Sequence, residues 1–292
     1  VVGLGLLFGN GAASYLSRLL GNGDKEKADK VASTALYSSI TVGAIMIIFS
    51  VIFLQPILKL LGATDSIMPY AITYASIYIV SCIFNVFNVT MNNIVTSEGA
   101  AKTTMLALMA GAILNIGLDP VFIYVLDMGV AGAAIATAIS QIVSTLVYLT
   151  FVLRKKSVYN FKIKNCTFTK EIMSEIFKIG IPTLVFQILT SLSISLVNTQ
   201  ARPYGDSVIA GMGAVTRVVS MGSLMVFGFI KGFQPIAGYS YGAKKFDRLH
   251  EAIKTSIIWS TVFCVIYGLV LTVFSKGIIS QFTKGDLEMI RV

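Results

Sequence analysis

The chain has 292 residues, of which 55% are hydrophobic and only 13% are charged, and its mean hydropathy is +0.80. A soluble domain carries roughly 25% charged residues, so this composition excludes one and indicates a membrane protein. The net charge of +9 raises the question of a nucleic-acid partner. The basic residues cluster in alternate loops, however, as the positive-inside rule requires, and we therefore expect no nucleic-acid partner.

Eight apolar segments follow one another along the chain. They are predicted at residues 1–19, 31–58, 66–94, 102–126, 129–153, 173–200, 203–232 and 252–277. All but the first are long enough for the roughly 20 apolar residues of a spanning helix. The fold class predicted is an all-α polytopic membrane protein, and the chain is interpreted as a fragment because it begins in the middle of an element.

The charged residues divide the segments into two groups. The connection after 129–153 is the only long hydrophilic one, and we predict an N-terminal bundle at 1–153, a cytoplasmic linker at 154–172 and a C-terminal bundle at 173–292. Lys231 closes the 203–232 segment and is assigned to the flank of a cytoplasmic loop. Arg217 is then the one basic residue expected well inside that segment.

The chain also contains a weak internal repeat. An offset of 221 residues aligns Gly21 with Gly242, Gly11 with Gly232, and Asp65 with Asp286. The loops and apolar segments stay in phase over this alignment, and an even number of helices separates the copies. We therefore expect two parallel six-helix bundles related by a pseudo-two-fold axis along the membrane normal, with the first helix and the last three helices missing here.

Asp119 is the acidic residue that lies deepest in a predicted segment. A carboxylate at that depth costs at least a few kcal/mol and indicates a functional site by default. Asn115 lies one turn away on the same helix face, and Thr137 is expected at the same depth on the next helix. These oxygen donors suit a proton or a hard cation such as Na⁺. A structural carboxyl, bonded between helices, remains the alternative.

Two further polar stripes lie in otherwise apolar helices. Asn85, Asn88 and Asn92 recur at helical spacing, and they either line a cavity or join helices by hydrogen bonds. Gln187, Ser191 and Ser195 form the second stripe, for which cavity lining is favoured because no charge accompanies it. One histidine and three separated cysteines make no cluster, so we expect no metal site beyond a possible Na⁺ at Asp119, Asn115 and Thr137.

Five spaced motifs carry a family resemblance. They are "SRLLGNGDKEKA", "SEGAAKTT", "NIGLDPVFIYVLDMGVAGAAIATAISQ", "GIPTLVFQ" and "GFQPIAGYSYGAKKFDRLHEA". Together they resemble the MATE family of multidrug and toxin extrusion transporters, and within it the MepA-like bacterial exporters. The resemblance implies a coupling site in the first bundle, for which Asn115, Asp119 and Thr137 match three of the residues; the Asp of the first helix would lie before Val1. Thr190 stands where another branch has a Glu.

The function expected from these features is secondary antiport. The chain would export amphiphilic or cationic small molecules in exchange for H⁺ or Na⁺, without another cofactor, as a monomer in lipid of a bacterial plasma membrane. A lipid-linked saccharide flippase of the same superfamily is the alternative, although such cavities tend to be rich in basic residues and these segments are not. An enzyme is not expected, because no nucleophilic, acidic and histidine groups converge.

Overall fold

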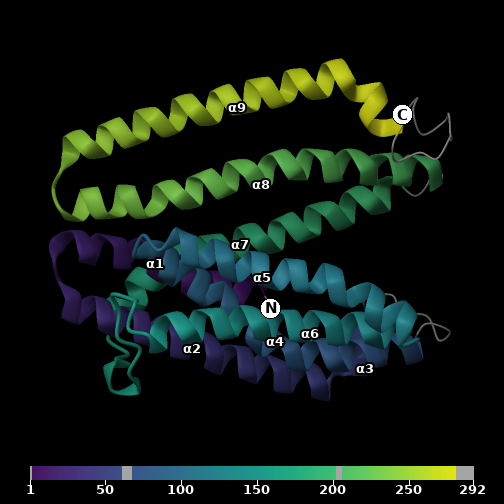
Figure 1. Cartoon of the computed structure of the whole chain (residues 1–292), viewed down its shortest axis with the longest axis horizontal. Helices are drawn as coiled ribbons and strands as arrows, with labels where there is room; N and C mark the ends of the chain where they lie inside the picture. The colour runs from purple at the N-terminus through teal and green to yellow at the C-terminus, as the bar shows by residue number, and fades with distance from the viewer. Residues whose placement is uncertain (1, 61–67, 202–205, 281–292) are drawn as a thin grey trace.

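The computed structural model describes residues 2–60, 68–201 and 206–280, nearly all of them helical (Figure 1). The long helices are α1 (Val2–Asn22), α2 (Lys25–Ile52), α4 (Met68–Ser97), α5 (Ala101–Pro120), α6 (Gly129–Leu153), α7 (Lys170–Ala201), α8 (Asp206–Gly242) and α9 (Phe246–Ser280). Three short elements complete the described part: the helix α3 (Leu54–Leu60), the π-helical turn η1 (Val121–Val125) and the 3-10 turn η2 (Ile163–Asn165).

Seven of these helices are long and apolar enough to cross a membrane, which confirms the polytopic class. The boundaries differ from the prediction in places. The 31–58 segment is two helices, because α2 begins at Lys25 and ends at Ile52, before α3. Asp24 caps the early start by accepting a hydrogen bond from the Lys27 backbone N–H at 3.1 Å.

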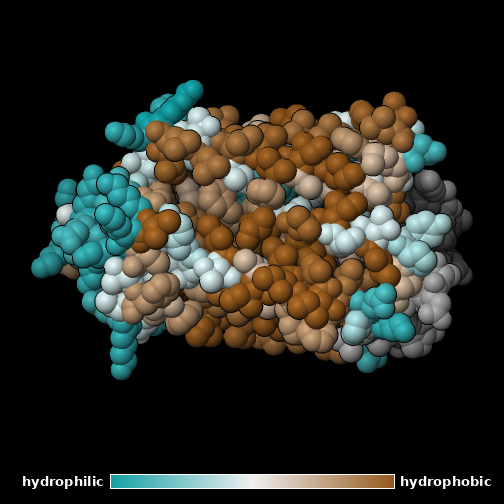
Figure 2. Space-filling view, turned by 90° about the horizontal axis from the view of Figure 1, so that it is seen from below, coloured by the Kyte–Doolittle hydropathy of each residue, from teal (hydrophilic) through white to brown (hydrophobic). Residues whose placement is uncertain are grey.

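The connections that were predicted to be cytoplasmic lie at one end of the molecule, called here the basic end (Figure 1). It carries the turns at 23–24, 98–100 and 243–245 and the loop 154–169. Its basic side chains are Lys25, Lys27, Lys30, Lys102, Arg154, Lys155, Lys156, Lys162, Lys164, Lys170, Lys244, Lys245 and Arg248. Figure 2 shows a broad apolar band across the molecule and hydrophilic side chains gathered beyond it at this end. The band is the surface that lipid would cover.

The internal repeat is visible at the contact between α1 and α8. Both helices run toward the basic end, where α1 turns downward into α2 and α8 turns upward into α9 in the view of Figure 1. A methyl group on Gly21 would lie 2.2 Å from the Tyr239 carbonyl oxygen, and one on Gly242 would lie 2.1 Å from that of Arg18.

These two close approaches are images of one another. The offset of 221 carries Gly21 onto Gly242 and Arg18 onto Tyr239, so each contact maps onto the other, as across a two-fold axis. Ser17 and Gly238, also related by 221, meet directly, since a methyl group on Gly238 would lie 2.5 Å from the Ser17 Cβ atom. The predicted parallel repeat is confirmed at this contact. The aligned pair Asp65 and Asp286 lies outside the described residues.

The linker is docked on the first bundle rather than running free. Asp29 of α2 accepts hydrogen bonds from the Asn160 backbone N–H at 2.9 Å and from its side-chain amide at 3.0 Å. Thr34 donates to the Thr167 carbonyl oxygen and accepts from its N–H. The helix α7 begins at Lys170, three residues before the predicted start of the C-terminal bundle at residue 173.

The glycine contact between α1 and α8 gives the first testable prediction. Gly242→Ala should lower the free energy of unfolding by about 1–3 kcal/mol, because the new methyl group meets backbone that cannot rotate away. Gly268→Ala is the matched control, since nothing lies within 4 Å of a methyl group at that position of α9. Thermal unfolding in detergent measures both variants. Equal stability of the two would contradict the close crossing.

Candidate functional site

The predicted ion site lies where α5 gives way to η1. The Asn115 side-chain amide donates to the Asp119 Oδ1 atom at 3.2 Å, and both side chains are half-buried. Pro120 ends α5, and η1 follows at once, with the Leu126 N–H bonded to the Val121 carbonyl oxygen. Proline has no N–H to donate, and π-helical turns occur often at functional sites. Asp119 therefore borders an irregular stretch of helix.

Thr137 lies at the depth of this pair. In the antiparallel packing of α5 on α6, Gly111 faces Ser144 and Gly132 faces Phe122, which places Thr137 between the levels of Asn115 and Asp119. The Thr137 hydroxyl donates to the Ala133 carbonyl oxygen of its own helix at 3.0 Å. No hydrogen bond joins it to Asp119 within the described ranges. The structure thus brings Asn115 and Asp119 into contact, and Thr137 to their level.

The asparagine stripe of α4 divides into two roles. Asn88 is buried, and its amide donates to the Gln141 side-chain oxygen at 2.8 Å while its oxygen accepts from Thr145 at 2.9 Å. Asn92 donates to the Tyr148 hydroxyl at 3.2 Å. These two residues join α4 to α6, which is the helix-joining alternative.

Asn85 differs from its neighbours in the stripe. Its side-chain oxygen is buried, and no hydrogen bond reaches it from any residue that the structure describes. The packing of α4 beside α6, given by the Asn88 contacts, sets Asn85 near the level of Ser140 and therefore of Asn115. A buried carbonyl oxygen without a donor is a group that a cation or water satisfies.

The residues of the polar stripe on α7 lie in different environments. Gln187 is half-buried and approaches the Gly3 position of α1. Ser191 is exposed and bonds to the Gln187 carbonyl oxygen of its own helix at 3.0 Å. The side chain of Ser195 lies outside the described residues. Thr183, one turn before Gln187, accepts a hydrogen bond from Asn10 of α1 at 3.1 Å and so links α7 to the first bundle.

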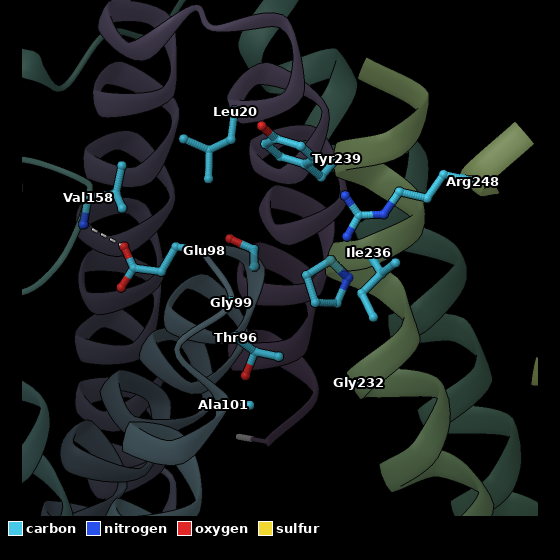
Figure 3. A pocket seen from close by; sticks show the side chains of 12 residues that line it. Leu20, Thr96, Glu98, Gly99, Ala101, Val158, Gly232, Ile236, Tyr239 and Arg248 are labelled. Atoms are coloured by element: carbon cyan, nitrogen blue, oxygen red, sulfur yellow. Dashed lines mark hydrogen bonds between the residues drawn. The ribbon is translucent and has the colours of Figure 1, made fainter. Parts of the chain in front are cut away.

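A cavity of about 550 Å³ opens at the basic end between the two bundles (Figure 3). Thr96, Glu98 and Val158 lie on one side of it, and Ile236, Tyr239 and Arg248 lie on the other. The Glu98 carboxyl points toward Val158, whose N–H donates to it at 2.7 Å, and the Ser157 hydroxyl donates to the same oxygen at 2.8 Å. Burial raises the Glu98 pKa to about 7 despite these hydrogen bonds.

The raised Glu98 pKa predicts a pH-dependent stability. The folded chain holds this proton up to about pH 7, whereas the unfolded chain releases it near its ordinary value of 4.5. The stabilisation by proton binding is therefore complete below pH 4.5 and is lost as the pH rises to about 7. Wild-type melting temperature should fall over this window relative to Glu98→Gln, which cannot titrate. Parallel pH profiles would contradict the assignment.

A second cavity, of about 580 Å³, lies on another side of α8 and is called here the Lys231 cavity. Its walls come from α1, α7, α8 and α9, with Asn10, Ser14, Arg18 and Lys231 among the polar residues. The assignment of Lys231 to a loop flank is wrong, because α8 continues to Gly242 and places Lys231 about 16 Å along the axis from that end. Lys231 is partly buried there, and its ammonium donates to the Asn93 side-chain oxygen of α4.

Neither cavity is lined by the coupling candidates or by the polar-stripe candidates Asn85, Asn88, Asn92, Gln187 and Ser191. Sequence reasoning missed the basic-end cavity and the position of Lys231. The signal for Lys231 was available in the motif "KGFQPIAGYSYG", which has no further charged residue after the lysine. Pro235 does not end the helix, which continues through it to Gly242.

Parallel repeats, a polar contact at their interface and one membrane-embedded carboxylate define a class of polytopic proteins built like transporters. The MatE family model matches residues 1–121 and 182–291. The chain belongs to the MatE family.

Two curated relatives are the multidrug export proteins MepA of Staphylococcus aureus and Staphylococcus saprophyticus. The first is 32% identical over 286 residues, which cover 98% of this chain and 63% of the relative. The second is 32% identical over 277 residues, with 95% and 61% coverage. The chain therefore spans less than two thirds of the length of either relative.

Solved structures of the same family agree with the fold. A MATE structure in the bent conformation superposes with a TM-score of 0.91 and 27% identity, covering 99% of this chain and 65% of that one. A MOP superfamily transporter from Pyrococcus furiosus has a TM-score of 0.91 and 27% identity, with 99% and 64% coverage. Its description attributes a different function to the reversed polarity of its binding pocket.

Proposed function

We propose that the chain is part of a secondary antiporter that exports amphiphilic or cationic small molecules, with H⁺ or Na⁺ as the driving ion bound at Asp119. The observation that carries the proposal is the Asn115–Asp119 hydrogen bond beside η1 in a spanning helix. Membership of the MatE family supports the transport class. The names of the two MepA relatives support multidrug export.

The local geometry suits an ion that is bound and released. Asn115 occupies one Asp119 oxygen, and no hydrogen bond reaches the other oxygen from the described part of the chain. A proton on that oxygen, or a Na⁺ beside it, neutralises a charge that is costly at this depth. Asn85 and Thr137 lie near this level and offer neutral oxygens to complete a Na⁺ shell.

The cycle then follows from charge neutralisation. With the ion bound, the region around Asp119 is neutral and the bundle adopts one packing arrangement. After release, the carboxylate favours an arrangement that admits water to it. Substrate bound between the bundles is exposed to opposite sides of the membrane in the two arrangements, which is alternating access driven by an ion gradient.

Replacement of the carboxylate tests this proposal directly. Asp119→Asn keeps the shape and the Asn115 contact but cannot ionise, so uptake of a fluorescent cation into everted vesicles should no longer respond to a pH or Na⁺ gradient. The loss should exceed about tenfold, because the charge itself is removed rather than one ligand. Binding of the dye to the purified variant should persist.

A matched control separates ionisation from general damage. Asp127→Asn changes the only other acid between residues 103 and 153, in the turn before α6. That variant should keep the gradient response. Full gradient-driven uptake by Asp119→Asn at normal expression would sink the proposal and leave Asp119 with a structural role.

The neutral ligand Thr137 should matter less. Thr137→Ala removes one hydroxyl at the level of Asp119, worth about 1 kcal/mol, so the apparent affinity for the driving ion should weaken by roughly fivefold. Thr137→Ser retains the hydroxyl and should behave like the wild type. Titration of vesicle uptake against external Na⁺ and against pH distinguishes these outcomes. Equal affinity in all three chains would remove Thr137 from the site.

One structural observation favours the flippase alternative. The sequence disfavours it because the predicted segments are nearly free of Lys and Arg apart from Arg217, whereas the structure places Lys231 within α8 and in the lining of a cavity. For the Pyrococcus furiosus transporter, the reverse polarity of the binding pocket is described as suggesting a different function. Efflux of the soluble dye, with no movement of a labelled lipid pyrophosphate, would support export.

A further inference from the structure

Lys231 is a charge that the proposed ion coupling does not use. It is one of the two basic residues that line the Lys231 cavity, and its hydrogen bond to Asn93 joins α8 of the second bundle to α4 of the first. Asn93 is itself buried and donates its amide to the Val89 carbonyl oxygen. The ammonium has three donors and Asn93 occupies one of them.

The charges around the cavity do not balance. Arg18 also lines it, but its guanidinium is paired with Glu175 of α7 at 2.7 Å. Lys231 has no carboxylate within salt-bridge distance in the portion of the chain that the structure describes. The remaining lining residues are neutral. Lys231 is therefore the basic residue of the lining that has no carboxylate partner among the described residues, whereas Arg18 shares Glu175 with Lys178.

A partly buried ammonium with only a neutral partner is costly, since each ion removed from water costs several kcal/mol before it is paired. A neutral amide returns only part of that cost. A carboxylate returns more, because a charge-assisted hydrogen bond is about twice as strong as a neutral one. The cavity is thus better suited to a ligand with one negative charge than to a purely cationic one.

The other walls describe the rest of such a ligand. Phe227, Phe233 and Tyr241 contribute aromatic surface, and Asn10 and Gln234 contribute neutral polar groups. Aromatic rings favour a flat apolar body. A pyrophosphate carries at least two negative charges, which the single free ammonium does not match.

We propose that Lys231 binds the carboxylate of an aromatic amphiphile in the Lys231 cavity, so that this chain selects carboxylate-bearing, including zwitterionic, substrates over their uncharged esters. The proposal rests on the proposed transport function and narrows its substrate class. It assigns Lys231 a specificity role, separate from the ion coupling at Asp119.

A matched dye pair tests the proposal by binding alone. A rhodamine with a free carboxylic acid and its methyl ester share one fluorophore and differ by that one negative charge. Fluorescence anisotropy with the full chain purified in detergent gives a dissociation constant for each dye. Wild type should bind the acid more tightly than the ester, and Lys231→Gln should weaken acid binding by about tenfold or more while the ester changes little.

Three further variants guard against misfolding. Lys231→Arg keeps the charge and should retain the preference. Asn93→Asp keeps Lys231 but supplies an internal carboxylate, so acid binding should weaken and ester binding should not. Lys245→Gln removes the same charge from an exposed turn and should leave both constants unchanged.

Some results overturn the assignment. The proposal is wrong if the ratio of the acid and ester dissociation constants is the same in Lys231→Gln and Asn93→Asp as in the wild type. It is also wrong if the wild type binds the ester but not the acid. Gradient-driven uptake of the ester by wild-type vesicles would, in either case, leave the export function standing. If wild-type vesicles show no gradient-driven uptake but the purified chain still binds the acid more tightly than the ester, the export function would be wrong and the anion site would stand.

Discussion

The structure depends on the close crossing of α1 and α8. The helices approach until backbone touches backbone, which is possible only because Gly21 and Gly242 carry no side chain at the contact. In a lipid environment such packing substitutes for the hydrophobic effect, which does not drive helices together there. The same device sets α7 against α1, since a methyl group on Gly180 would lie 2.2 Å from the Leu7 carbonyl oxygen.

The sequence predicted the architecture because hydropathy, loop charge and the repeat are one-dimensional signals. Apolar length indicates a spanning helix wherever it occurs, and an offset of 221 needs no knowledge of contacts. Helix ends were less predictable. The predicted segment 203–232 ends next to Lys231, where hydropathy falls. The helix itself continues to Gly242, because the hydrogen bonds of a helix are made by its backbone and a charged side chain does not break them. Asn93, remote in sequence, supplies the partner that makes a lysine tolerable there.

Polar residues within the helices show a second limit. The spacing of Asn85, Asn88 and Asn92 places them on one face but does not say what that face meets. Asn88 and Asn92 meet polar groups of α6, whereas the oxygen of Asn85 meets none among the described residues. For Asp119 and Asn115, by contrast, one helix turn fixes the contact, so spacing alone was sufficient. Local pairs are readable from sequence, while pairs between helices depend on their rotation.

The two embedded charges lie at different depths and in different bundles. Asp119 lies about 27 Å along α5 from its start at Ala101, whereas Asn93, which binds the Lys231 ammonium, lies only about 6 Å from the end of α4 at the same turn. A separation of about 20 Å excludes a direct ion pair between them, and salt screens charges beyond roughly 10 Å wherever water enters. If Asp119 responds to the ion and Lys231 to the substrate, the two must communicate through packing. The α1 and α8 crossing joins the bundles that hold them, with backbone against backbone at Gly21 and Gly242.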